Sequence, residues 1–136
     1  MTILAAVADD AVRERVLDVA VDLGGGLDQN VYVVHLVDDA SAGADARRLR
    51  DEVREYLAGA GVASTVAVEA VSHTSARPGP RIARELIDAA ADVEVTHIVM
   101  GHAPKGLLER LMEGSTAFAV ADETSLPVTI VPAEGI

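Results

Sequence analysis

The stretch VTHIVMGHAPKG, residues 95–106, decides the fold. Residues 95–100 form a short apolar run rich in β-branched side chains, a pattern typical of a strand buried on both faces. Gly101 ends the run, a loop follows, and Gly114-Ser115 stand where a helix is expected to begin and to continue to about Thr124. A buried strand that leads through a loop into a helix is the repeating unit of α/β proteins.

The rest of the chain repeats this alternation. Asp9-Asp10 precede a helix that Gly24-Gly25-Gly26 are expected to end, and Pro80 fits the first turn of a third helix. Apolar runs predict strands over residues 3–8, 31–37, 95–100 and 127–131, and an alternating pattern predicts a strand closer to a sheet edge over residues 64–71. The second helix is expected to turn one stripe inward, consisting of Ala46, Leu49, Val53, Tyr56 and Leu57. This order predicts one α/β domain over residues 1–136, with a five-stranded parallel sheet and helices on both of its faces.

The composition limits the partners. Twenty-two acidic residues stand against 11 basic ones, for a net charge of −11, and Lys105 is the one lysine. Such a surface repels nucleic-acid phosphates and anionic lipids, so we expect neither as a partner. The chain has no cysteine, and no apolar run approaches the ~20 residues that span a bilayer. We therefore expect a cytoplasmic protein, and its acidic, lysine-poor composition resembles that of proteins from halophilic archaea.

Ligands of open α/β sheets bind outside the carboxyl ends of the strands, where the strand order reverses. This rule directs attention to residues 8–10, 37–39 and 101–115. Amides at the N-terminus of the last helix would favour an anion there, and glycine at 101 and 114 would let a phosphate chain approach the backbone. The same residues could instead form an ordinary turn and helix cap.

Two bases lie in the loop after the fourth strand, namely Lys105 and Arg110. They either neutralise the charge of a bound phosphate chain or are ordinary surface cations. The sequence does not decide between these two interpretations.

On these residues the chain resembles the universal stress protein family. Nucleotide-binding members carry Gly-x2-Gly-x9-Gly-Ser/Thr after the fourth strand, and Gly101 and Gly114-Ser115 match the first and last positions. Residues 96–102 (THIVMGH) and 126–132 (LPVTIVP) fit as well, so the likeness covers nearly the whole chain. The resemblance implies the adenine nucleotide alpha hydrolase-like, Rossmann-like architecture.

The resemblance also implies a ligand and a site. The ligand would be ATP, with Mg²⁺ held mainly by phosphate oxygens and water, and no residue is assigned to the metal. One wall of the site would be lined by Met100, Gly101, His102 and Ala103. The phosphates would be held by Gly114, Ser115 and Thr116. Val37 would lie near the base, and Asp9 near the ribose. A homodimer formed through the C-terminal strand, residues 128–131, is implied too.

Two positions depart from the family pattern. Pro104 replaces the second glycine and has no amide hydrogen to donate, and Ala8 stands where the family's first strand usually carries an acid. Two hypotheses therefore stay open. One is an ATP-binding stress-response module whose occupancy alters dimer or partner interactions. The other is a family member that binds no nucleotide and acts as a dimeric scaffold.

Dedicated catalytic machinery is not expected. No nucleophile, general base or arginine finger is evident at the predicted site, so we expect at most weak ATP hydrolysis. His35 and His97 lie inside apolar strands, which is typical of core or interface histidines rather than metal ligands. His102 has no partner at ligand spacing and is expected to be a loop histidine.

Overall fold

The computed structural model describes most of the domain. Five segments carry the sheet and the main helices, and four further residues belong to the segment before the fourth strand. The described residues are 1–8, 12–38, 42–71, 84, 86–88, 94–102 and 116–132.

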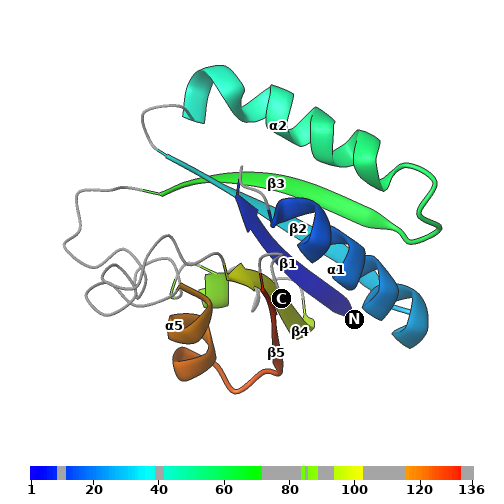
Figure 1. Ribbon diagram of the computed structural model, residues 1–136, viewed down its shortest axis with the longest axis vertical. Helices are drawn as coiled ribbons and strands as arrows, with labels where there is room; N and C mark the ends of the chain where they lie inside the picture. The colour runs from blue at the N-terminus through cyan, green and yellow to red at the C-terminus, as the bar shows by residue number, and fades with distance from the viewer. Residues whose placement is uncertain are drawn as a thin grey trace.

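A five-stranded sheet forms the middle layer (Figure 1). All its strand pairs are parallel, and their order in space is β3-β2-β1-β4-β5. The predicted fold class is therefore confirmed. The strands are β1 (Thr2–Ala8), β2 (Asn30–Asp38), β3 (Ser64–Val71), β4 (Val95–His102) and β5 (Val128–Pro132).

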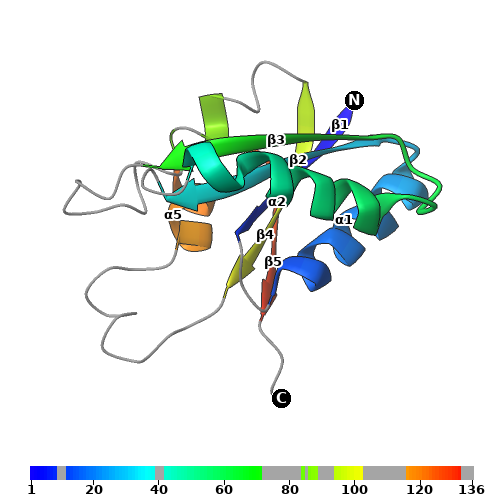
Figure 2. The same ribbon diagram turned by 90° about the horizontal axis from the view of Figure 1, so that it is seen from above.

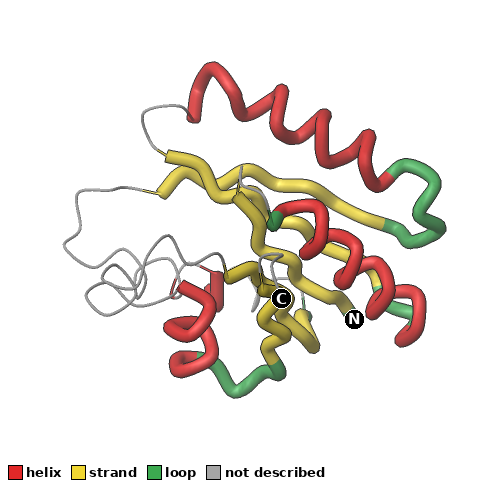
Figure 3. The backbone as a smooth tube through the Cα atoms, in the orientation of Figure 1, coloured by secondary structure: helices red, strands yellow, loops and turns green. Residues whose placement is uncertain are grey.

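Of the labelled helices in the described residues, α1 and α2 lie on one face of the sheet and α5 lies on the other. The helix α1 (Arg13–Leu27) packs mainly over β1, and α2 (Ala42–Leu57) packs over β3 and β2 (Figures 1 and 3). The helix α5 (Thr116–Glu123) lies against β4 and β5 (Figure 2). Crossovers between parallel strands are right-handed. The chain adds β2 and β3 on one side of β1, and β4 and β5 on the other. Right-handed crossovers in these two directions place their helices on opposite faces of the sheet.

The strands read as continuous apolar runs because both of their faces are buried. One core cluster joins alternate residues of the strands to α1 and α2, among them Ile3, Val33 and Val99. The other joins the intervening strand residues, such as Leu4 and Ile98, to Leu86 and to Val120 of α5. Leu86 belongs to the predicted third helix, most of which lies outside the described residues.

The glycine run does not end α1, contrary to the sequence-based expectation. The helix continues through Gly24, Gly25 and Gly26 to Leu27, and Asp28 caps it in the left-handed conformation with φ of 55°. The amide of Gln29 donates to the carbonyl of Gly24, which closes the last turn. A Cβ on Gly24 would lie 3.0 Å from Cγ2 of Val31. Close packing on β2, rather than a turn, therefore explains the glycine at this position.

Within the described part of the chain, no helix is long and apolar enough to cross a membrane.

Candidate functional site

The sheet has one switch point, between β1 and β4. From β1 the chain builds outward through β2 to β3, then returns to add β4 and β5 on the other side. The register pairs Ala6 with Met100, so the carboxyl ends of β1 and β4 are adjacent, at Ala8 and His102. Open α/β sheets bind ligands at this position, and the sequence analysis points to the ends of both strands.

At the end of β4, two predicted site residues point to opposite faces. The side chain of Met100 is 3% exposed and packs in the cluster that contains Leu86 and Val120. A Cβ on Gly101 would point to the opposite face, where it would lie 2.5 Å from Cγ1 of Val12 and 3.1 Å from Cγ2 of Val16. Both faces of β4 are thus filled by packing, so a ligand would meet the end of this strand rather than its sides.

The other predicted site residues are placed only in part. Val37 lies on β2, one residue beyond Leu36, which is the last residue of β2 that pairs with β1. His102 is the last residue of β4, paired in register with Pro132, and Thr116 is the first residue of α5. The predicted helix start at Gly114-Ser115 falls just before this point. Four of the predicted site residues lie outside the described residues, namely Asp9, Ala103, Gly114 and Ser115.

The first turn of α1 connects several elements beside these strand ends. Val12, which precedes the helix, rests on Gly101 of β4, and the guanidinium of Arg13 lies 3.3 Å from Nε2 of His35 on β2. Arg15 donates to the carbonyl of Pro132, the last residue of β5, at 2.6 Å. No local sequence pattern predicts these contacts, because they join residues 22 to 117 positions apart.

His35 is fully buried, as expected for a core histidine. Because the guanidinium of Arg13 can only donate, Nε2 of His35 is the acceptor in this contact. His97 is half-buried, and its Nε2 lies 2.7 Å from Oγ1 of Thr129 on the neighbouring strand. Among the described residues, no group of three or more potential metal ligands is close enough to hold an ion.

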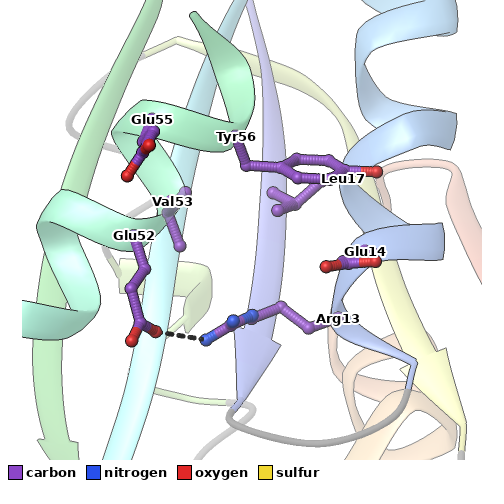
Figure 4. Close-up of a pocket in the computed structure, with 7 residues that line it drawn as sticks. All are labelled: Arg13, Glu14, Leu17, Glu52, Val53, Glu55 and Tyr56. Atoms are coloured by element: carbon purple, nitrogen blue, oxygen red, sulfur yellow. Dashed lines mark hydrogen bonds and ion pairs between the residues drawn. The ribbon is translucent and has the colours of Figure 1, made fainter.

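A pocket of about 350 Å³ lies between α1 and α2 (Figure 4). Arg13 reaches from α1 to Glu52 of α2, with 3.5 Å between the guanidinium and the carboxylate. Glu52 also accepts from Arg48 at 2.8 Å. The rest of the lining combines a buried apolar floor, formed by Leu17 and Val53, with side chains of Glu14, Glu55 and Tyr56.

Tyr56 stands at the far side of this pocket. The expectation that it belongs to the inward stripe is wrong in part, since the residue is 42% exposed. Its hydroxyl donates to Oδ1 of Asp18 on α1 at 2.7 Å. This hydrogen bond, then burial and the negative charges of Asp18 and Glu14, raise the pKa of Tyr56 to about 12. The phenol therefore stays protonated, and keeps donating, to a higher pH than an ordinary tyrosine.

A model of the universal stress protein family matches residues 1–132. No curated protein matches the chain.

Solved structures of similar fold cover almost the full length. A universal stress protein family member from Burkholderia pseudomallei has a TM-score of 0.70 and 24% identity, covering 97% of this chain and 96% of its own. A universal stress protein from Archaeoglobus fulgidus in complex with dAMP has a TM-score of 0.67 and 20% identity, covering 96% of each chain. A universal stress protein in complex with cAMP has a TM-score of 0.70 and 17% identity, covering 98% of each.

Proposed function

Since the chain belongs to the universal stress protein family, we propose that it is a stress-response module that binds ATP at the carboxyl ends of β1 and β4. In this proposal, nucleotide occupancy tunes the interactions of a homodimer or of other partners. The observation that carries the proposal is the sheet order, which sets the end of β4 beside the end of β1 at the switch point.

Two further observations support adenine nucleotide as the ligand. The motif positions Gly101 and Gly114-Ser115 keep the family spacing, with Gly101 one residue before the end of β4. Two of the similar structures are complexes with cAMP and dAMP. Because packing fills both faces of β4, the proposed contacts are at the strand end, from His102 onward, and at the start of α5 near Thr116.

A divalent cation would come with the triphosphate. Mg²⁺ usually binds through phosphate oxygens and retained waters, with few protein ligands. Among the described residues, no group of three or more potential ligands is placed to hold the ion, and the proposal assigns no protein residue to it. The net charge of −11 opposes an anionic ligand, so the proposed site depends on local amides at the N-terminus of α5.

Calorimetric titration of ATP and Mg²⁺ into nucleotide-stripped protein tests the proposal. We expect saturable heat in the micromolar range, strongly weakened by Gly114→Val, while Gly26→Ala at the far end of α1 leaves binding unchanged. No heat and no thermal shift at millimolar ATP would contradict it. A phosphate-release assay on the same samples would measure turnover, which we propose to be weak or absent.

The second candidate is a dimeric scaffold that binds no nucleotide. Its support is β5, which lies at the edge of the described sheet with β4 as its one neighbour. The amide of Ile98 donates to the carbonyl of Pro127. By the alternation of a parallel ladder, the amides of Val128 and Ile130 then point away from β4, toward the open edge.

Sedimentation of the wild type and of Ile130→Pro tests this second candidate. The substitution removes an outward amide without removing a bond to β4, so we expect a dimer to become a monomer of retained circular dichroism. A wild type that is monomeric at high protein concentration would exclude the proposed dimer. A dimer that never responds to ATP would favour the scaffold over the nucleotide-regulated module.

A further inference from the structure

The open edge of β5 carries backbone groups that a second copy of the chain can use. The bond from the amide of Ile98 to the carbonyl of Pro127 sets the alternation of the ladder with β4. By that alternation, Val128, Ile130 and Pro132 turn their backbone groups away from β4. The first two each present an amide and a carbonyl, whereas Pro132 presents a carbonyl alone because proline has no amide hydrogen.

Both ends of this edge are already occupied by side chains of the same chain. At the C-terminal end, Arg15 of α1 donates to the carbonyl of Pro132 at 2.6 Å, so its guanidinium takes the position of a partner's amide. At the N-terminal end, the amide of Leu126 donates to Oγ1 of Thr124 at 3.1 Å. The middle of the described edge is therefore what remains for a partner.

The charges at the two ends of the edge favour a second copy as that partner. The strand itself, VTIVP, carries no charge in a chain whose net charge is −11. Arg15 places a cation at the C-terminal end of the edge, and the exposed Glu123, the last residue of α5, places an anion before its N-terminal end. Two identical edges related by a two-fold axis pair antiparallel, which brings the unlike ends of the two copies together.

Shifting the pairing along the edge in either direction requires a group that is already bound. With Ile130 on the two-fold axis, Val128 lies opposite Pro132 of the partner subunit. The amide of Val128 would then need the carbonyl that Arg15 occupies. With Val128 on the axis, the amide of Leu126 would be needed, and it already donates within its own chain. Each shifted register therefore competes with a hydrogen bond that the single chain makes.

We propose that a second copy pairs with β5 in the register that avoids both occupied groups. In this register Val128 lies opposite Ile130 of the partner subunit, and Thr129 lies on the two-fold axis. Val128 and Ile130 exchange both of their backbone hydrogen bonds, once on each side of the axis. Arg15 and Thr124 are positioning residues that confine the pairing to this register. The inference rests on the homodimer proposed above and does not depend on nucleotide binding.

Single cysteines report the register directly, because the chain has none of its own. Thr129 would lie about 4.5 Å, Cα to Cα, from its symmetry mate in a non-hydrogen-bonded pair, a distance that a disulfide spans. The mates of residues 128 and 130 would lie a diagonal apart, about 7–8 Å, which is too far. Thr129→Cys should therefore oxidise to a covalent dimer on non-reducing gels, whereas Val128→Cys and Ile130→Cys should not. Cross-linking that is fastest at position 128 or 130 would show a dimer of another register and overturn the inference.

Arg15→Met tests the positioning role of the arginine. Methionine cannot donate, so the carbonyl of Pro132 becomes available to the partner subunit. In this background the cross-linking of Ile130→Cys should rise about tenfold, the ratio that corresponds to about 1.4 kcal/mol. Arg15→Lys still donates and is the matched control, in which Ile130→Cys should stay slow. Unchanged cross-linking of Ile130→Cys in the Arg15→Met protein would show that Arg15 does not set the register.

Thr124→Val is the corresponding test at the other end of the edge. It frees the amide of Leu126, so cross-linking of Val128→Cys should rise while that of Ile130→Cys does not. Circular dichroism of each reduced variant checks that the fold is retained.

The same samples separate this inference from the function proposed above. A monomer in sedimentation, with no cross-link at any of the three positions, would contradict the homodimer and this inference with it. A cross-link at Thr129→Cys in a protein that does not bind ATP would support the inference and contradict the nucleotide site.

Discussion

Gly101 lies directly beneath Val12, and the contact leaves no room for a methyl group between them. A Cβ at position 101 would come within 2.5 Å of one methyl carbon of Val12 and 3.4 Å of the other. Val12 is itself 4% exposed and precedes the first turn of α1. The glycine of the proposed nucleotide motif is therefore also a packing position for the start of α1. Its roles in packing and in nucleotide binding can be separated experimentally.

Gly101→Ala should destabilise the protein in the absence of any ligand. Overpacking a filled core position typically costs about 1–3 kcal/mol of unfolding free energy, measurable by urea denaturation. In a Val12→Ala background the same substitution should cost less, because the clashing methyl groups are gone. Equal losses of unfolding free energy in the two backgrounds would show that the cost of Gly101→Ala does not come from a clash with Val12.

The three helical glycines should respond differently to alanine. A Cβ on Gly26 would meet nothing within 4 Å, and one on Gly25 would reach only Cγ2 of Val62 at 3.9 Å. Gly25→Ala and Gly26→Ala should each raise the unfolding free energy by about 0.5–1 kcal/mol, since alanine is the better helix former.

Gly24→Ala is the matched control for these substitutions. Its Cβ would lie 3.0 Å from the carbonyl oxygen of Gln29, so the gain in helix propensity should be lost to crowding. Urea denaturation of the three variants compares them directly. If Gly24→Ala raised the unfolding free energy, the close packing of Gly24 against Gln29 would be contradicted.

Substitution of Arg13 should lower the unfolding free energy more than substitution of Glu52, the residue with which it forms an ion pair. Arg13→Met removes the donor that faces the fully buried His35, and lost hydrogen bonds to buried groups cost about 1–3 kcal/mol. Glu52→Gln weakens a longer, partly exposed ion pair, for which less than about 1 kcal/mol is expected. Chemical denaturation of both variants decides the order, and a larger cost for Glu52→Gln would reverse the assignment.

The hydroxyl of Tyr56 should titrate abnormally. In a Tyr32→Phe background, the ultraviolet absorbance of tyrosinate should report a pKa of about 12, and Asp18→Asn should return it toward the ordinary value of 10.0. Because the folded pKa is the higher one, the stabilisation from the Tyr56–Asp18 hydrogen bond is fully present below pH 10 and is lost as the pH rises toward 12. An unshifted titration would mean that the hydrogen bond is absent in solution.

Salt should stabilise the fold. With a net charge of −11, repulsion among carboxylates opposes the compact state, and added ions screen it. The midpoint of thermal unfolding should rise with potassium chloride. The double variant Glu14→Gln, Asp22→Asn should respond less steeply, because it has lost two members of one acidic row. A midpoint independent of salt would contradict the expectation that repulsion among the carboxylates opposes folding.

The sheet could be predicted from the sequence because buried parallel strands carry a strong local signal. Residues such as Ile3, Val33 and Ile98 lie in largely apolar runs, which mark a buried strand whatever the order of the strands. Helix ends were harder to predict. The glycines of α1 look like a stop signal locally, yet the helix persists because Gly24 packs closely against β2.

The site was predictable only where it depended on local pattern. The end of β4 and its glycine follow from the motif spacing, and the switch point supports their relevance. The contact of Gly101 with Val12 could not be read from the sequence, because it requires β4 to return beside β1 under α1. The pocket between α1 and α2 could not be predicted for the same reason. Its two walls are formed by residues some forty positions apart in the sequence. The exposure of Tyr56 could not be predicted either, because it depends on the contact of Tyr56 with Asp18 on the other helix.

The placement of β1 in the middle of the sheet has a consequence for synthesis on the ribosome. Residues 2–71 emerge first and can pair as β3-β2-β1, but the partner for the other side of β1 is made only with residues 95–102. Until then the most apolar strand of the protein, ILAAVA, presents an open edge to other nascent chains. A pause in translation before β4 should therefore favour aggregation, whereas a pause after β5 should not.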